Sequence, residues 1–256
     1  MSAARGTLYL VPNTLDFGFH GPTPDLQDAL PLGVIRIASR LGHWIAENAK
    51  TTRAFLKRVD AIAPLGRSLQ AISIVELPRA PKGGAAKSVA FDAAVLLQPA
   101  LQGHDVGLIS EAGLPAVADP GAAVVATAHA LDIRVVPLPG ASSLLLALAA
   151  SGLNGQSFAF VGYLPTDSAA RGVRIRELEA ASRRLLQTQL AIETPYRNTA
   201  LLAALLEHLQ GATRLSVSCA LTLPGGFART ERVTAWRTRP TALPADLPAV
   251  FSFLAD

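Results

Sequence analysis

The segment from Asp105 to Gly152 constrains the fold more than any other part of the chain. It contains two short apolar runs, Asp105–Ser110 and Ile133–Leu138, and each run ends in a loop of glycine, proline and small residues. An alanine-rich helical pattern follows each loop. Strands that alternate with helices in this way are typical of a mostly parallel sheet. Loops at the carboxyl ends of such strands bind ligands, so the segment predicts both a fold class and a site.

Each of the two loops carries a signal for the start of a helix. Asp119 is expected to accept hydrogen bonds from the first helical N–H groups, and Pro120 suits the first helical position because its missing N–H has no partner there. At Pro139–Ser143 the small side chains let a ligand approach the main chain closely. Ordinary strand-to-helix turns would also explain one such loop. Two loops on neighbouring strands favour a ligand site.

The strand pattern divides the chain into two parts. Before Gly152 strands alternate with helical patterns such as Lys50–Val59 and Ser88–Leu101, whereas later strands have fewer helices between them. We therefore predict an α/β fold, with an N-terminal α/β domain of residues 1–153 and a C-terminal α+β domain with a mixed sheet of residues 154–256. The later helices are expected at Ala169–Leu186 and Asn198–Leu209. The expected strands are Leu8–Val11, His43–Ala46, Ser73–Leu77, Val106–Ser110, Arg134–Leu138, Ser157–Val161, Thr188–Ile192, Arg214–Ala220, Arg232–Ala235 and Ala249–Leu254.

Composition and missing motifs exclude several classes of protein. The single cysteine, Cys219, allows no internal disulfide and fits a reducing cytoplasm, and its apolar neighbours predict a buried strand residue. No P-loop, no G-x-G-x-x-G after the first strand and no G-x-S-x-G is present, which disfavours NTPases, dinucleotide dehydrogenases and serine hydrolases. The five histidines lack metal-ligand spacing, so we expect no metal. The longest apolar run, Leu144–Ala150, is too short to span a membrane.

The net charge of +4 tolerates an anionic partner such as RNA without requiring one. Few aromatic side chains lie near the densest basic stretch, so no platform for base stacking is evident there. A solvated helix face is therefore favoured over a nucleic-acid patch for this stretch. Its residues are Arg171, Arg174, Arg176, Arg183 and Arg184.

A series of motifs then identifies a family. The motifs are GTLYLVP at 6–12, LISEAGLPAVADPG at 108–121, VVPLPGASS at 135–143, ASGL at 150–153, FVGYLP at 160–165 and IETPYR at 192–197. In this order they resemble the tetrapyrrole methylase superfamily, and within it the ribosomal RNA small-subunit (cytidine-2′-O-)methyltransferases. The resemblance covers nearly the whole chain. It implies two α/β-type domains with S-adenosylmethionine bound in a cleft between them, usually in a homodimer.

Carried over by position, the resemblance also assigns residues to the cofactor. The loop at 110–117 would line its methionine and ribose end, and Ser142 and Ser143 would contact the same ligand. Glu193 and Thr194 would approach from the second domain, and Ala220 and Leu221 would lie on the adenine side. In the loop at 110–117 the assigned residues are Ser110, Glu111, Ala112, Gly113, Leu114, Pro115 and Val117.

The chain departs from the family pattern in the loops expected near the acceptor. The family's Ala-Glu-Asp-Thr-Arg motif is stretched to AENAKTTR at 46–53, and the first loop reads NTLDFG at 13–18. A ribose hydroxyl is a weak nucleophile, so a base or a cation beside it would help methyl transfer. Glu47 is the candidate base, and Arg53 the candidate contact for the hydroxyl or an adjacent phosphate. An ordinary helix-end ion pair between Glu47 and Arg53 is the alternative.

The resemblance thus predicts a cytoplasmic, S-adenosylmethionine-dependent methyltransferase that acts on the ribose 2′-O of ribosomal RNA. Two other functions stay open. The acceptor could be a tetrapyrrole or another small metabolite, or the chain could be a divergent paralogue that binds the cofactor without catalysis. Methyl incorporation into ribosomal RNA fragments would distinguish the first function from the other two.

Overall fold

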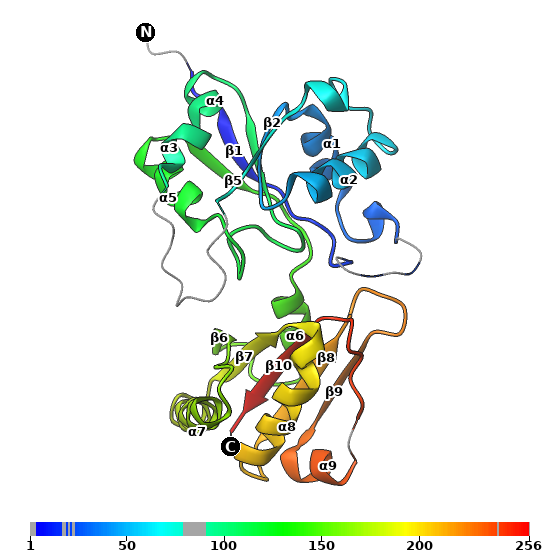
Figure 1. Ribbon diagram of the computed structural model, residues 1–256, viewed down its shortest axis with the longest axis vertical. Helices are drawn as coiled ribbons and strands as arrows, with labels where there is room; N and C mark the ends of the chain where they lie inside the picture. The colour runs from blue at the N-terminus through cyan, green and yellow to red at the C-terminus, as the bar shows by residue number, and fades with distance from the viewer. Residues whose placement is uncertain are drawn as a thin grey trace. The chain divides into compact units, whose positions relative to one another are not determined.

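The computed structural model describes residues 4–16, 19, 21, 24–78, 91–239 and 241–255. The chain divides into two compact units, the first with residues 4–16, 24–78 and 91–141 and the second with residues 19, 21, 142–239 and 241–255. Each unit has its own five-stranded sheet with helices packed against it (Figure 1). Within the described residues, no helix combines the length and the apolar character needed to cross a bilayer.

The first sheet is entirely parallel, which confirms the predicted architecture of this part of the chain. Its strand order is β3-β2-β4-β1-β5. The central strand β4 is buried along its whole length, as expected for an apolar run covered on both faces. The strands are β1 (Thr7–Leu10), β2 (His43–Ala46), β3 (Ser73–Glu76), β4 (Val106–Ile109) and β5 (Arg134–Pro137).

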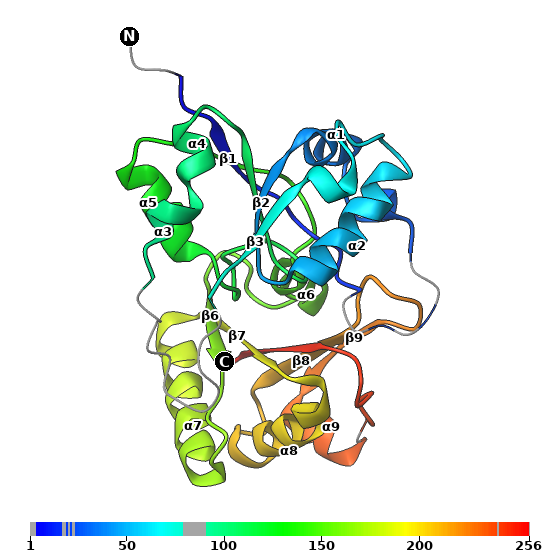
Figure 2. The ribbon, with the colours of Figure 1, turned by 45° about the horizontal axis from the view of Figure 1, so that its top comes forward.

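Helices cover both faces of this sheet, with α1 and α2 on one face and α3, α4 and α5 on the other (Figures 1 and 2). Neighbouring residues of one strand point into different cores, since Trp44 packs with α1 and α2 whereas Ile45 packs with α3 and α5. The helices are α1 (Leu32–Arg40), α2 (Ala49–Asp60), α3 (Ala93–Leu96), α4 (Gln98–Leu101) and α5 (Ala122–Ala130), with short 3-10 turns η1 (Leu26–Asp28) and η2 (Leu69–Ala71). Residues 88–90 of the predicted helix Ser88–Leu101 lie outside the described residues.

The neighbouring strands β1 and β4 are followed by helices on opposite faces of the sheet. The chain leaves β1 toward α1, which packs in the core of one face, and leaves β4 toward α5, which packs in the core of the other. Such a reversal is a topological switch point, where the two outgoing loops leave room for a ligand beyond the strand ends. The loops after β1 and β4 therefore form the candidate site.

The second sheet is mixed, as predicted for this part of the chain. Its strand order is β6-β7-β10-β8-β9. β6 and β7 are parallel, whereas β10 runs antiparallel to both of its neighbours and β9 antiparallel to β8. The strands are β6 (Phe158–Tyr163), β7 (Thr188–Glu193), β8 (Arg214–Cys219), β9 (Phe227–Arg232) and β10 (Ala249–Leu254). Cys219 is buried in β8, as its apolar neighbours predict.

The two faces of the second sheet are covered by different helices. Phe251 and Phe253 of β10 point into the larger core, which also contains Trp236, whereas Val250 points to the opposite face. There Leu144 and Leu148 of α6 pack against Val250. The helices are α6 (Ser143–Ser151), α7 (Ser168–Leu185), α8 (Asn198–His208) and α9 (Val233–Thr238), with the 3-10 turn η3 (Pro195–Arg197).

Two local predictions are wrong. The strand expected at Arg232–Ala235 is instead the end of β9 followed by α9, in which the Trp236 indole N–H donates to the Leu215 carbonyl oxygen at 2.9 Å. The expected Asp119 cap is also absent, because α5 begins at Ala122 and its N-cap is Gly121. Gly121 has a φ of +130°, a conformation that side-chain-bearing residues rarely adopt, and this displaces the helix start beyond Pro120.

Candidate functional site

Glu47 and the loop at 110–117 meet at the carboxyl edge of the first sheet. Glu47 follows β2, and the loop follows the neighbouring strand β4. The Glu111 N–H donates to Oε2 of Glu47 at 3.0 Å, and the Glu47 N–H donates to the Ile109 carbonyl oxygen at 3.1 Å. The structure therefore brings together these residues, which the sequence connects only through the family resemblance.

Asn13 joins the loop after β1 to the loop after β4, across the switch point. Its side-chain amide donates to the carbonyl oxygens of Ser110 and Glu111, both at 3.1 Å. Its own N–H donates to the Gly113 carbonyl oxygen at 2.8 Å. Asn13 is not among the site residues that the sequence predicts. The sequence signal that points to it is the unusual first loop, NTLDFG, of which Asn13 is the first residue.

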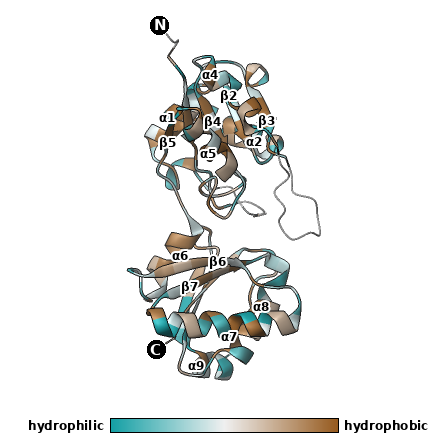
Figure 3. Cartoon of the chain, turned by 90° about the vertical axis from the view of Figure 1, so that its left-hand side faces the viewer, coloured by the Kyte–Doolittle hydropathy of each residue, from teal (hydrophilic) through white to brown (hydrophobic). Residues whose placement is uncertain are grey.

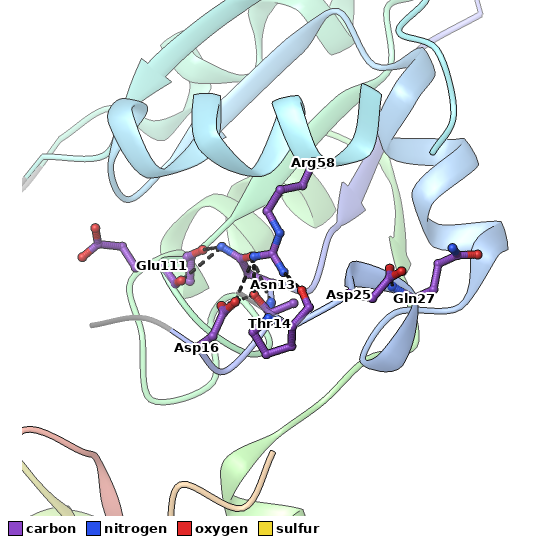
Figure 4. Close-up of polar contacts among 9 residues, drawn as sticks. Asn13, Thr14, Asp16, Asp25, Gln27, Arg58 and Glu111 are labelled. Atoms are coloured by element: carbon purple, nitrogen blue, oxygen red, sulfur yellow. Dashed lines mark hydrogen bonds and ion pairs between the residues drawn. The ribbon is translucent and has the colours of Figure 1, made fainter. Parts of the chain in front are cut away.

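The first loop is fixed in turn by Arg58 of α2 (Figure 4). The Arg58 guanidinium donates to the Thr14 hydroxyl at 3.2 Å and forms an ion pair with Asp16 at 3.0 Å. It also donates to the Pro24 carbonyl oxygen at 3.0 Å, and the Thr14 hydroxyl bonds the other oxygen of Asp16. Both side chains of the ion pair are largely buried, so removal of one would leave an uncompensated charge.

Small residues give the loop after β4 an unusual backbone. Gly113, Ala116 and Ala118 all have φ near +65°, the left-handed region in which a Cβ atom is unfavourable. A side chain at Gly113 would come within 3.4 Å of Leu15 and 3.7 Å of the Ala141 carbonyl oxygen. The loops after β1, β4 and β5 therefore approach one another closely at this edge.

Three carboxylates give this edge its electrostatic character. Burial raises the pKa of the Asp119 carboxyl to about 7, and the negative charges of Glu47 and Glu111 act in the same direction, while the Ser110 side chain opposes the rise. Near neutral pH the Asp119 carboxyl is thus partly protonated. A cationic ligand beside it would favour its ionised form.

Arg53 does not pair with Glu47. It is exposed on α2, and its guanidinium donates to the Ala49 carbonyl oxygen of its own helix at 3.4 Å. The ion pair considered as an alternative role for these two residues is therefore not formed among the described contacts.

The other residues that the resemblance assigns to the cofactor lie in the second unit. Glu193 and Thr194 are at the end of β7, and Ala220 and Leu221 follow β8. These strand ends share one edge, because Ala249 of β10 pairs with Glu193 on one side and Cys219 on the other. Ser142 and Ser143 are at the start of α6, whose Leu144 packs near Leu221. Within this unit the structure brings the three segments together.

The Glu193 carboxylate is bonded to neighbouring residues of its own unit. It is buried and forms an ion pair with Arg197 at 2.8 Å. It also accepts the Thr194 N–H at 2.8 Å and the Thr194 hydroxyl at 3.2 Å. Glu193 therefore fixes the turn after β7, and Thr194 is the more accessible of the two residues.

The arginines of α7 lie on a polar helix face, visible as hydrophilic stretches in Figure 3. Arg174 pairs with Glu177 at 3.1 Å, Arg176 bonds His208 at 3.3 Å and Arg183 bonds Gln210 at 3.2 Å. These three arginines therefore bond polar side chains at the protein surface, as expected if this helix face is solvated. Across the described part of the chain, no group of three or more His, Cys, Asp or Glu side chains could hold a metal ion.

Known proteins match this chain along most of its length. The model of the family described as Tetrapyrrole (Corrin/Porphyrin) Methylases matches residues 45–235. A Pseudomonas aeruginosa protein named ribosomal RNA small subunit methyltransferase I is 41% identical over 112 residues, 44% of this chain and 38% of that protein. A protein of the same name from Micromonospora olivasterospora is 31% identical over 212 residues, 79% of this chain and 56% of that protein.

The chain thus spans at most 56% of the length of these two relatives. Among solved structures, the crystal structure of the methyltransferase CobJ matches 98% of this chain and 94% of that chain, with a TM-score of 0.56 and 17% identity. At this identity the match supports the fold alone.

Proposed function

We propose, from the premise that this chain belongs to the tetrapyrrole (corrin/porphyrin) methylase family, that it is an S-adenosylmethionine-dependent methyltransferase acting on ribosomal RNA. The observation that carries the proposal is the switch point of the first sheet. There the loops after β1, β2 and β4 are hydrogen-bonded to one another, and small residues leave the main chain accessible.

The residues at this edge fit S-adenosylmethionine. When bound, this cofactor supplies a methyl group on a positively charged sulfur. The carboxylates of Glu47, Glu111 and Asp119 favour a cationic ligand. The main-chain groups of the loop at 110–117 suit the methionine and ribose end of the cofactor. The assignments of Ser142, Ser143, Glu193, Thr194, Ala220 and Leu221 to the same cofactor stay predictions.

Ribosomal RNA as the acceptor rests on the names of the relatives and on the net charge of +4. Arg53, exposed on α2, is proposed to contact the ribose hydroxyl or an adjacent phosphate. Much of the rate acceleration in methyl transfer comes from the alignment of the acceptor oxygen with the methyl carbon. We extend the proposal to a homodimer and to a cytoplasmic location, which rest on the family resemblance and on the ribosomal acceptor.

The first test is calorimetric titration of the purified protein with S-adenosylmethionine and then with S-adenosylhomocysteine. We expect binding of both at micromolar strength, about −8 kcal/mol. Absence of binding by either compound would contradict the proposed cofactor and would favour a paralogue with another role.

The second test identifies the acceptor. Protein and methyl-labelled S-adenosylmethionine are incubated with small ribosomal subunits that lack the modification. Label that enters RNA and is lost on ribonuclease treatment supports the proposal. Label that enters a dialysable, ribonuclease-resistant product would instead indicate a small-molecule acceptor.

A further inference from the structure

We infer that Asn13 and Glu47 are positioning residues. Together they hold the backbone of Ser110 and Glu111 in the conformation that contacts the cofactor. The inference rests on the proposed function. It also gives Glu47 a different task from the proton acceptor expected from the sequence, because its carboxylate acts here on the protein's own main chain.

The first step is the geometry around one peptide unit. Asn13 donates to the carbonyl oxygens of Ser110 and Glu111, both at 3.1 Å, and Glu47 accepts the Glu111 N–H at 3.0 Å. Three successive backbone polar groups are therefore bonded by two side chains, which come from the ends of β1 and β2 on the two sides of β4. These bonds determine which remaining groups of the loop face outward.

The second step is that Asn13 is itself immobilised. It is 6% exposed, its N–H donates to the Gly113 carbonyl oxygen at 2.8 Å, and its side-chain oxygen accepts the Thr14 N–H at 2.9 Å. The next residues are tied to α2 through Asp16 and Arg58. Because the backbone N–H and the side-chain oxygen of Asn13 are both hydrogen-bonded, its side-chain amide has a fixed position. A binding site requires such fixed donors.

The third step concerns the chemistry available to Glu47. An oxygen atom that accepts an amide N–H performs this task without taking up a proton, and a glutamine carbonyl oxygen can replace it. A general base must instead take a proton, which glutamine cannot do. The Glu47→Gln variant therefore separates the two roles, whereas Glu47→Ala removes both.

The experiment compares Glu47→Gln, Glu47→Ala, Asn13→Ala and Asn13→Asp with the wild-type protein. Asn13→Asp keeps the shape and the acceptor for Thr14 but loses the two donated bonds. Glu76→Ala is the matched control, because Glu76 accepts the Ala49 N–H at 2.7 Å at the end of β3, away from Ser110 and Glu111. Thermal unfolding checks that each variant is folded.

Two quantities are measured: the hydrogen-exchange rate of the Glu111 amide and the affinity for S-adenosylhomocysteine. We expect about tenfold faster exchange and about tenfold weaker binding in Glu47→Ala and in both Asn13 variants, the size of one lost hydrogen bond. Glu47→Gln should restore both to within about threefold of wild type, because glutamine keeps the acceptor for the Glu111 N–H. It should still transfer methyl groups, at a rate lowered by the loss of one carboxylate that favours the cationic cofactor. Glu76→Ala should resemble wild type.

Exchange and affinity that stay at the wild-type level in Glu47→Ala and Asn13→Ala would overturn the inference. So would a Glu47→Gln variant that binds S-adenosylhomocysteine normally but transfers no methyl group, since Glu47 would then be the base. Failure of the proposed function has a different signature. There the wild-type protein does not bind S-adenosylhomocysteine, although the exchange pattern of the variants still supports the fixed backbone.

Discussion

At the scale of single residues, Asp119 carries a pH dependence that can be measured without any ligand. Its pKa is about 7 in the folded protein, against 3.8 for an unperturbed carboxyl, because of burial and the charges of Glu47 and Glu111. Well below pH 3.8 the carboxyl is protonated in both states and contributes nothing. As pH rises to about 7 the unfolded state ionises first, so the folded state loses stability. Above pH 7 this loss is complete.

We therefore expect Asp119→Asn to gain stability relative to wild type as pH rises from 4 to 7, with the gain constant above that range. Unfolding temperatures at intervals across pH 4–8 measure the difference between the two proteins. A difference between the two proteins that stays constant across this pH range would contradict the raised pKa of Asp119.

The sequence predicted part of this site, for identifiable reasons. Glycine, proline and small residues after an apolar run mark a strand-end loop locally, so the loop at 110–117 was recognisable. The hydrogen bond of Glu47 to this loop was not predicted, because the family resemblance identified Glu47 only as a candidate base near the acceptor. The role of Asn13 depends on β1 and β4 being neighbours, and strands so far apart in sequence leave no local sign of their pairing.

At the scale of elements, α7 ends in a residue that is poorly suited to its backbone. Leu186 is the C-cap, with φ +49° and ψ +42°, and its side chain is 65% exposed. The left-handed region costs a side-chain-bearing residue about 1–2 kcal/mol, which glycine avoids. Allowing for the greater freedom of glycine in the unfolded chain, Leu186→Gly should raise the free energy of unfolding by about 0.5–1 kcal/mol.

Chemical denaturation measures this change. Leu185→Gly is a matched control, because Leu185 is 50% exposed and is the last residue of the helix. There glycine should lower the free energy of unfolding, by roughly 0.5–1 kcal/mol. Two variants that change stability in the same direction would show that backbone conformation at Leu186 is not the cause.

Most elements were predictable because each has a strong local pattern. The mostly apolar strands β2 and β10 matched their predicted bounds, and the ends of most other strands shifted by one or two residues. β9 was missed because its sequence, FARTER, is polar and lies at the edge of the sheet. α9 was mistaken for a strand because a six-residue helix gives too short a pattern. Its Trp236 is held by tertiary contacts with Leu215 and Arg229.

At the scale of the whole molecule, the packing of α6 makes the extent of the second unit testable. The unit has its own core around Trp236, Phe251 and Phe253. α6 covers the opposite face of the same sheet with Leu144 and Leu148. A fragment of residues 142–256 is therefore expected to fold cooperatively. A fragment of residues 154–256, which starts at the boundary predicted from the sequence, would expose Leu190 and Val250.

Loss of the two leucines should cost the shorter fragment roughly 3–6 kcal/mol. Circular dichroism melting curves and gel filtration of the two fragments measure the difference. Equal stability of the fragments would favour the boundary at residues 153–154. A shorter fragment that aggregates or melts much earlier would assign α6 to the second unit as a folding element.

The pairing of β1 also affects how the protein folds while it is being made. Leu8 pairs with Val106 on one side and Val135 on the other, so β1 finds no partner in its sheet until β4 is synthesised, and it is paired on both sides only after β5. At roughly 5–20 residues per second, that delay is on the order of 10 s. An apolar strand that later lies inside a sheet is thus exposed while about a hundred further residues are synthesised. The yield of native protein in a cell should therefore depend on how well β1 is protected from aggregation until β4 and β5 have been synthesised.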